Sequence, residues 1–471
     1  MSDSGLFVMF PKALKPNKTV NKKIEVMKKN IDRRKFIQNA SMVSAVGALT
    51  IGALSSCAKT KSSEELGLPP LKKAAPKGKK LKAGLIGCGH RGTGALLNFL
   101  SSGPGLEVGA LGDVFPEKVA SVKERLAKYK LTVPEDKCFT GLDAYQKVME
   151  TDVDVVLLAT PPYFRPDHFK AAVQAKKHVF MEKPVAVDPV GIRSVIASAR
   201  TASQLGLNVV TGTQRRHQRD YIATYEQVAN GAIGKPLSAK AYWNQEHVWF
   251  RRRQEGWTDM EYMLRNWNNF SWLSGDHILD THIHNIDVVN WFLGKTPVSA
   301  VGYGGRHRRE TGNQYDFFSI DFNYGNGSFS HSMSRQIDNC ANGVGEMVMG
   351  TKGYTNCRDK IYDLDGNVIW QYQYPLDKEG NPTTKVKVSP YIQEHIHLVT
   401  AIRSNIYVNE AERTALSNLT AIMGREAAYT GKRITWDEIM SSKQKMGPNE
   451  LTINTNYKAP DTPLPGTAIK S

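Results

Sequence analysis

The sequence predicts two folded domains: a doubly wound parallel α/β domain over residues 81–212 and an α+β domain with a mainly antiparallel sheet over residues 213–445. Short apolar segments alternate with helical periodicity in the first region, whereas strand patterns and hairpin turns precede helices in the second. The chain of 471 residues also exceeds the roughly 250 to 300 residues at which single cores stop growing. Residues 446–471 are expected to form a C-terminal tail.

The composition is that of a globular protein, with 41% hydrophobic and 23% charged residues. The net charge of +17 is concentrated at the N-terminus, because residues 1–82 contain 18 Lys or Arg and 5 Asp or Glu. The rest of the chain carries only about +4, an ordinary surface charge. We therefore predict no nucleic-acid partner.

The five cysteines show none of the Cys/His spacings that enclose zinc, so we predict no metal site. Cys340 and Cys357 could pair in an oxidising compartment. Two buried free thiols are the favoured interpretation.

Residues 1–60 resemble a twin-arginine export signal with an upstream extension. Arg33 and Arg34 precede residues 36–58, which carry no charge and are rich in Ala, Gly and Ser. A membrane-spanning helix is the alternative, but the segment is only weakly apolar. We expect an exported, periplasmic protein whose leader begins at Met27, with a cytoplasmic location as the alternative.

A lipobox-like sequence, Leu54-Ser55-Ser56-Cys57, ends this region. Acylation of Cys57 would hold the protein at a membrane surface as a lipoprotein. Residues 61–80 are dominated by Lys, Pro, Ala and Gly, a composition that buries little apolar surface. We predict that they form a tether.

A glycine-rich loop follows the first strand of the α/β region. Residues 81–86 are apolar and lead into Gly-Cys-Gly-His-Arg-Gly at residues 87–92, which opens a helical pattern. In a Rossmann domain the first glycine permits a tight turn, the second lets a pyrophosphate approach, and the third lets the helix pack. We therefore predict a bound dinucleotide, with contacts from Gly87, Gly89, His90, Arg91 and Gly92.

An acidic residue ends the second predicted strand. Residues 106–111 are apolar and lead into Gly112-Asp113, about twenty residues beyond the glycine loop. A carboxylate at this position accepts hydrogen bonds from ribose hydroxyls and repels a 2′-phosphate. The predicted cofactor is therefore NAD, with NADP less favoured.

The alternation of strands and helices continues to residue 212. Ligands of parallel sheets bind at the carboxyl ends of the strands, so residues after each strand are further candidates for cofactor contacts. Those candidates are Thr160, Pro161, Glu182, Lys183 and Gln214. The strands are predicted at 153–159, 178–181 and 207–212, and the helices at 166–176 and 189–205.

Residues 80–440 resemble the Gfo/Idh/MocA oxidoreductases, the family of glucose-fructose oxidoreductase and inositol dehydrogenase. The resemblance rests on the glycine loop, on Ala159-Thr160-Pro161, on Glu182-Lys183-Pro184 and on residues 274–287. It implies an NAD(P)-dependent enzyme that acts on CH–OH groups of a carbohydrate. It further implies that the sheet of the second domain is an open mixed one. It also implies a homo-oligomer, because this domain often mediates dimerisation in the family.

The segment at residues 274–287 supplies candidate catalytic groups. Asp280, His284 and Asp287 are spaced to share one helix face. A neutral imidazole suits removal of a hydroxyl proton near pH 7, so His284 is the candidate base, with Asp280 orienting it or the substrate. Lys183 would relay the proton and bind the substrate oxygen, and the resemblance assigns the same three positions. Asp287 is interpreted as structural.

The second domain is expected to contain strands from residue 236 to 373, with hairpin turns at 325–327 and 365–367. Helices are expected to return near Ile392 and after a capping-box-like Asn409-x-x-Glu412, ending near Gly431.

Substrate contacts are harder to assign. Candidates are Arg215, His217 and Trp243, while the run Arg251–Arg253 is interpreted as a solvated face. Tryptophans can stack on sugar rings, although core positions are an equal alternative. Five tryptophans precede the catalytic segment: Trp243, Trp249, Trp257, Trp267 and Trp272.

Export favours a tightly bound cofactor that is reduced and reoxidised within one catalytic cycle. A sugar or polyol oxidoreductase is the first hypothesis. An NAD-dependent glycoside hydrolase resembling family 109, which oxidises its substrate transiently before elimination, is the second, and Arg91-Gly92 resembles the glycine loop of that family. A sugar-binding protein without turnover is the third.

Overall fold

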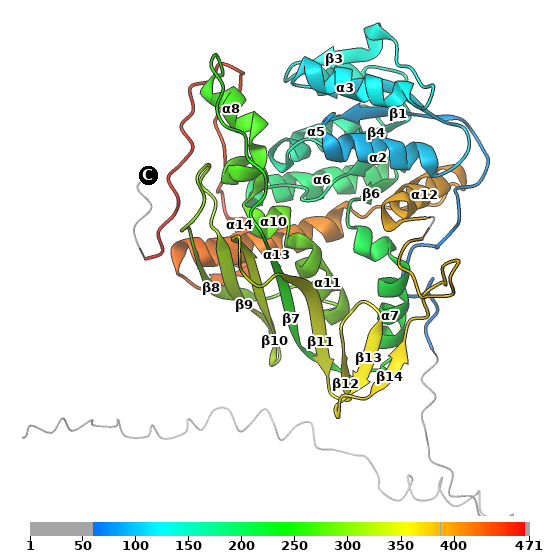
Figure 1. Ribbon diagram of the computed structural model, residues 1–471, viewed down its shortest axis with the longest axis vertical. Coiled ribbons are helices and arrows are strands. Elements are labelled where there is room, and N and C mark those ends of the chain that lie inside the picture. The colour runs from blue at the N-terminus through cyan, green and yellow to red at the C-terminus, as the bar shows by residue number, and fades with distance from the viewer. Residues whose placement is uncertain (1–59, 387, 467–471) are drawn as a thin grey trace, which may run out of the picture. The chain divides into compact units, whose positions relative to one another are not determined.

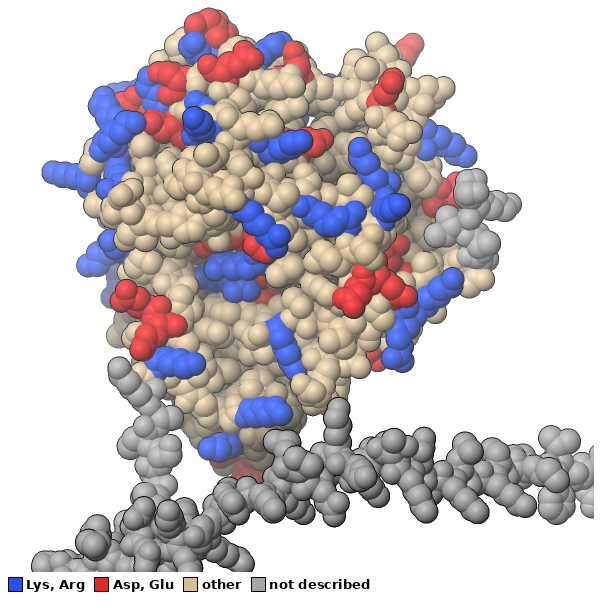
Figure 2. All heavy atoms as spheres, turned by 180° about the vertical axis from the view of Figure 1, so that it is seen from behind, with Lys and Arg blue, Asp and Glu red and all other residues tan. Residues whose placement is uncertain are grey.

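The computed structural model describes residues 60–386 and 388–466, which belong to one unit that begins at Thr60. The predicted export signal, with Arg33, Arg34 and Cys57, lies outside the described residues and stays a prediction. Among the described helices, none has the length and apolar character needed to span a membrane. On the face seen in Figure 2, acidic and basic side chains are interspersed.

The N-terminal domain is built on six parallel strands in the order β3-β2-β1-β4-β5-β6 (Figure 1). The strands β1, β4, β5 and β6 are apolar and largely buried because helices cover the sheet, which confirms the predicted doubly wound α/β fold. The strands are β1 (Leu81–Ile86), β2 (Leu106–Asp113), β3 (Cys138–Thr140), β4 (Val155–Leu158), β5 (His178–Met181) and β6 (Val209–Thr211). The helices are α2 (His90–Ser101), α3 (Pro116–Ala127), α4 (Ala144–Met149), α5 (Arg165–Gln174) and α6 (Pro189–Gln204).

The second domain contains a nine-stranded sheet in the order β14-β13-β12-β11-β7-β10-β9-β8-β15. Only β7 and β10 pair in parallel, so the predicted mixed, mainly antiparallel sheet is confirmed, and both predicted hairpin turns join strands. The strands are β7 (Pro236–Gln245), β8 (Ser299–Gly305), β9 (Phe317–Gly325), β10 (Ser328–Gln336), β11 (Gly343–Gly350), β12 (Gly353–Thr355), β13 (Lys360–Asp363), β14 (Val368–Gln371) and β15 (Ile434–Thr435).

The segment between β7 and β8 is helical, so the prediction of alternating strands from residue 236 to 373 was wrong there, although a helix was expected at residues 280–287. It forms α8 (Asp259–Arg265), α9 (Ser271–Ser274), α10 (His277–Asp280) and α11 (Ile283–Leu293). The helical structure is interrupted at Thr281 and His282, between α10 and α11. Here the buried His282 ring forms a hydrogen bond with Ser332 Oγ of β10 at 2.7 Å. Asp280 and His284 therefore do not share one helix face.

Helices α7 (Arg219–Ala229), α12 (Pro390–Arg403), α13 (Ala411–Thr430) and α14 (Trp436–Ser441) complete the domain. α13 ends at Gly431, which has a positive φ of 69°, as predicted. The predicted capping box is wrong, because Glu410 is the N-cap and Glu412 pairs with Arg200 at 3.0 Å.

Residues 60–80 pack against the folded unit, so they are not a free tether. Ala75 is buried, and Arg403 Nη1 donates to the Pro76 carbonyl at 2.7 Å. The segment needs no core of its own because it lies against one. Of the two cysteines predicted to be buried, Cys357 is buried but Cys340 is exposed, since it follows a turn at the end of β10.

Candidate functional site

The glycine loop joins β1 to α2 and has the geometry that its sequence requires. Gly87 has a φ of +96°, and a Cβ there would lie 2.6 Å from Thr160 N. A Cβ at Gly92 would lie 1.8 Å from the Gly87 carbonyl oxygen. At Gly89 a Cβ would meet no atom within 4 Å, so open space faces the N-terminus of α2. This space and the free N–H groups of a helix N-terminus fit a pyrophosphate.

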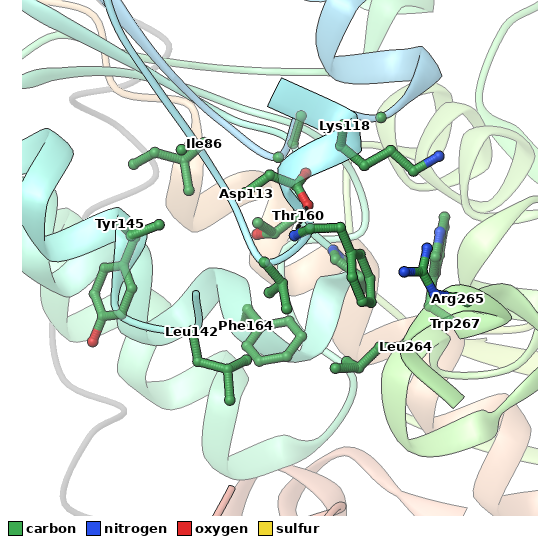
Figure 3. Close-up of a pocket in the computed structure, with 18 of the residues that line it drawn as sticks. Ile86, Asp113, Lys118, Leu142, Tyr145, Thr160, Phe164, Leu264, Arg265 and Trp267 are labelled. Carbon is green, nitrogen blue, oxygen red and sulfur yellow. Dashed lines mark hydrogen bonds between the residues drawn. The ribbon is translucent and has the colours of Figure 1, made fainter. Parts of the chain in front are cut away.

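A cavity of about 570 Å³ lies at the carboxyl ends of β1, β2 and β4 (Figure 3). Asp113 at its edge is held by two backbone donors, Cys88 N at 2.6 Å and Phe115 N at 3.0 Å. Burial raises the pKa of Asp113. A carboxylate fixed there can accept hydrogen bonds from the ribose hydroxyls of the cofactor, so the cavity fits NAD. The predicted residues that line it are Gly87, Gly89, His90, Asp113, Thr160 and Pro161.

The opposite wall of the cavity comes from the second domain. Figure 3 shows Leu264, Arg265 and Trp267 facing Asp113 and Thr160. Trp249 and Arg251 also line this wall. Arg251–Arg253 are exposed, as predicted for a solvated face, and Arg251 in addition borders the cavity. Sequence analysis missed this wall because no local pattern relates the segment after β7 to the end of β2.

Lys183 follows β5, the neighbour of β4, so it lies one strand along the sheet from the cavity. Its Nζ donates to the Asp280 carbonyl oxygen and lies 3.9 Å from Asp280 Oδ1. Burial lowers the pKa of Lys183, and the Asp280 carboxylate opposes this shift. Asp280 therefore orients Lys183, whereas the sequence predicted that it would orient His284 or the substrate.

His284 lies in the first turn of α11, beside Trp243 of β7. The two ring centroids are 5.9 Å apart, with planes inclined by 27°. Burial lowers the pKa of His284 well below its usual value, and the positive charges of Lys183, Arg215 and Arg91 act in the same direction. His284 is therefore a neutral imidazole at pH 7, able to accept a proton.

Arg91 and Glu182 pair with each other, Nε to Oε1 at 2.6 Å, and do not line the cavity. Arg91 Nη2 also lies 3.9 Å from Glu394 Oε2, and burial raises the pKa of Glu394 well above its usual value. Gln214 is buried, beyond the cavity lining. These three predicted cofactor residues support the loop and strand ends in this structure.

Arg215, a predicted substrate residue, lies beside Trp243 at the candidate site. Its guanidinium pairs with the buried Glu346 and lies 5.5 Å from the Trp243 ring centroid. Asp287 accepts two hydrogen bonds from Arg216, at 2.7 and 2.9 Å, as expected for a structural carboxylate.

His217 is not placed to contact a substrate, because it is buried against α12. His217 Nε2 lies 3.1 Å from His397 Nδ1 and 3.4 Å from Glu410 Oε1. Among the described residues these three side chains could supply metal ligands. However, Arg413 Nη2 lies 2.8 Å from the same Glu410 oxygen and already neutralises its charge. We assign the group as a structural network between η4 (Gln214–His217), α12 and the start of α13.

Two profiles of one family match the chain. Residues 81–209 match the "Oxidoreductase family, NAD-binding Rossmann fold", and residues 221–355 match the "GFO/IDH/MocA C-terminal domain". Together they cover more than half of the chain, and the first agrees with the NAD prediction.

Curated relatives include a glycosyl hydrolase family 109 protein of Shewanella amazonensis, 28% identical over 46% of this chain and 47% of the relative. Another is inositol 2-dehydrogenase of Salmonella typhimurium, 28% identical over 45% of this chain and 54% of the relative. The chain thus spans about half the length of the curated relatives it matches.

Solved structures share the fold. Scyllo-inositol dehydrogenase from Lactobacillus casei, with bound NAD(H) and scyllo-inositol, has a TM-score of 0.57 at 20% identity, covering 76% of this chain and 99% of that chain. Aldose-aldose oxidoreductase from Caulobacter crescentus has a TM-score of 0.57 at 20% identity, covering 76% of this chain and 100% of that chain. With both domains matched by its profiles, the chain belongs to the Gfo/Idh/MocA oxidoreductase family and carries that family's NAD-binding Rossmann fold.

Proposed function

We propose that this protein transfers a hydride between a secondary alcohol of a sugar or polyol and a tightly held NAD. The observation that carries the proposal is the convergence of Lys183, His284 and Arg215 beside the end of β5, one strand from a cavity that fits the dinucleotide. The inositol dehydrogenases among its relatives support a polyol or sugar substrate.

His284, Lys183 and Asp280 have separate roles in the proposed proton transfer. NAD, when bound, supplies the hydride acceptor or donor. Neutral His284 takes the hydroxyl proton of the alcohol, and the Lys183 ammonium donates a hydrogen bond to the same oxygen. Asp280 positions Lys183 through its carbonyl oxygen and carboxylate. In the reverse direction His284 returns the proton to the nascent alcohol.

The test is turnover of purified protein with a panel of inositols, aldoses and glycosides, together with mass spectrometry of whatever the denatured protein releases. We expect denaturation to release NAD stoichiometrically. With a second carbonyl substrate present to take the hydride back from the bound cofactor, we expect an inositol or aldose to be converted to its keto form or lactone as that acceptor is reduced. A protein that binds NAD in titrations but oxidises no member of the panel would contradict the proposal.

A glycoside hydrolase of the family 109 type is the second candidate, and the Shewanella amazonensis relative supports it. Its first hydride step needs the same Lys183 and His284. It predicts release of a monosaccharide from glycosides with no net change in NAD reduction. A binding protein without turnover predicts instead that Lys183→Ala and His284→Ala leave sugar affinity unchanged.

The acid limb of the pH–rate profile is expected to lie well below pH 6.5, the ordinary pKa of histidine. Burial and three nearby cations disfavour the protonated imidazole, so His284 remains a competent base as the pH falls through 6.5. The measurement is kcat/KM against pH for the wild type and His284→Asn, with the exposed Lys240→Met as control. A wild-type limb centred at pH 6.5 would exclude His284 as the base.

Two further properties belong to this proposal. The exposed face of the second sheet carries apolar side chains, among them Tyr303, Phe329, Met347 and Met349, and this supports a homo-oligomer that pairs through the sheet. The twin-arginine and lipobox motifs support export and attachment to a membrane surface through Cys57. Light scattering tests the first, and mass analysis of Cys57 in membrane fractions tests the second.

A further inference from the structure

We propose that residues 246–276 of the second domain, here called the cover segment, form part of the NAD site and keep the cofactor bound through successive turnovers. This inference rests on NAD binding under the proposed function. It names binding residues outside the Rossmann domain and gives the tight binding of the cofactor a structural cause.

The cover segment lies over the adenosine side of the cavity. Asp113 at the end of β2 marks the ribose position, and the cavity continues to Gly141 and Leu142 after β3. These strands lie away from β5, where Lys183 marks the reacting end. The cover segment contributes Trp249, Arg251, Leu264, Arg265 and Trp267 to the same cavity.

Arg265 connects the cover segment directly to the Rossmann domain. Its Nη1 donates to Glu117 Oε1 of α3 at 2.5 Å, and its Nε donates to Glu261 Oε1 at 2.8 Å. The guanidinium lies 3.9 Å from the ring centroid of Phe115 and 4.9 Å from that of Trp257. Arg265 is thus held from both domains, so breaking these contacts is expected to ease the release of a dinucleotide bound beside it.

The chemistry of this wall suits a dinucleotide. Lys118 and Arg251 place two cationic side chains at the cavity, which is appropriate for the diphosphate of NAD, whereas the charge of Arg265 is balanced by Glu117 and Glu261. Trp249 and Trp267 offer flat faces on which adenine can stack. Arg251 N also donates to Asn266 Oδ1 at 2.6 Å, which ties the two parts of the cover segment together.

The C-terminal tail backs the cover segment. Thr258 Oγ1 donates to the Ile453 carbonyl at 2.7 Å, and the Trp272 ring lies 5.5 Å from that of Tyr457. Met260, Phe270 and Trp272 form a buried cluster against which Leu451 and Tyr457 pack. Opening the cover segment therefore requires disruption of a packed apolar cluster, which predicts slow release of NAD.

The experiment compares release of radiolabelled NAD, chased by excess unlabelled NAD, from the wild type and Arg265→Met. Loss of the Glu117 and Phe115 contacts is expected to speed release by about tenfold or more. Arg253→Met is the matched control, because Arg253 belongs to the same segment but pairs with Asp259 and does not line the cavity. Glu117→Gln removes the same ion pair from α3, and covers the case in which Arg265→Met fails to fold.

Faster release from Arg265→Met or Glu117→Gln, with wild-type release from Arg253→Met, supports the inference. NAD binding with equal release from all variants overturns it and leaves the proposed function intact. A wild-type protein that binds no NAD overturns both.

Discussion

Replacement of Lys183 by methionine is expected to lower kcat/KM by about 10²- to 10⁴-fold while NAD binding is retained. Methionine keeps most of the side-chain volume but cannot donate to the Asp280 carbonyl or to a substrate oxygen. The buried ammonium is also a source of the positive charge that keeps His284 neutral. The measurement is steady-state oxidation of the best substrate, with NAD affinity measured separately by titration.

Lys170→Met is the matched control, because Lys170 is an exposed lysine on α5 of the same domain. It is expected to retain wild-type kcat/KM. Activity of Lys183→Met within a few-fold of the wild type would remove Lys183 from the mechanism and leave His284 as the remaining proton carrier.

Substitution by alanine is expected to lower the stability of the protein at Gly92 but not at Gly89. Gly92→Ala places a Cβ 1.8 Å from the Gly87 carbonyl oxygen, so the loop must shift. The free energy of unfolding should fall by about 1 to 3 kcal/mol. Gly89→Ala meets no protein atom within 4 Å, so its thermal stability without cofactor should be unchanged.

The effect expected for Gly89→Ala is on NAD affinity. The Gly89→Ala methyl group enters the space assigned to the pyrophosphate, so NAD binding should weaken by about 100-fold or more in a stable protein. Calorimetric titration and thermal denaturation measure the two quantities. Wild-type NAD affinity in Gly89→Ala would show that the pyrophosphate lies elsewhere.

The sequence was sufficient for features that depend on local pattern. The strand β1, the turn at Gly87 and the carboxylate of Asp113 follow from apolar runs and glycine spacing within some thirty residues, and the structure places all three at one cavity. The mainly antiparallel pairing of the second sheet was predictable from its hairpin turns, because those turns need specific residues, whereas the parallel pairing of β7 with β10 has no such local signal.

Features that depend on distant contacts were not predictable. The helix break before His284 is fixed by pairing of His282 with Ser332, fifty positions away. His217 resembled a substrate residue until folding placed it against Glu410. The contact between Arg265 and Glu117 spans 148 positions and has no periodic signature.

The tail contacts also set an order of events during synthesis. The cover segment, which forms the second-domain wall of the cavity, is supported by Ile453 and Tyr457 of the tail. A nascent chain can fold its Rossmann domain early, but the cover segment gains this support only after Met446, Ile453 and Tyr457 have left the ribosome. Capture of the cofactor is therefore expected to follow synthesis of these residues.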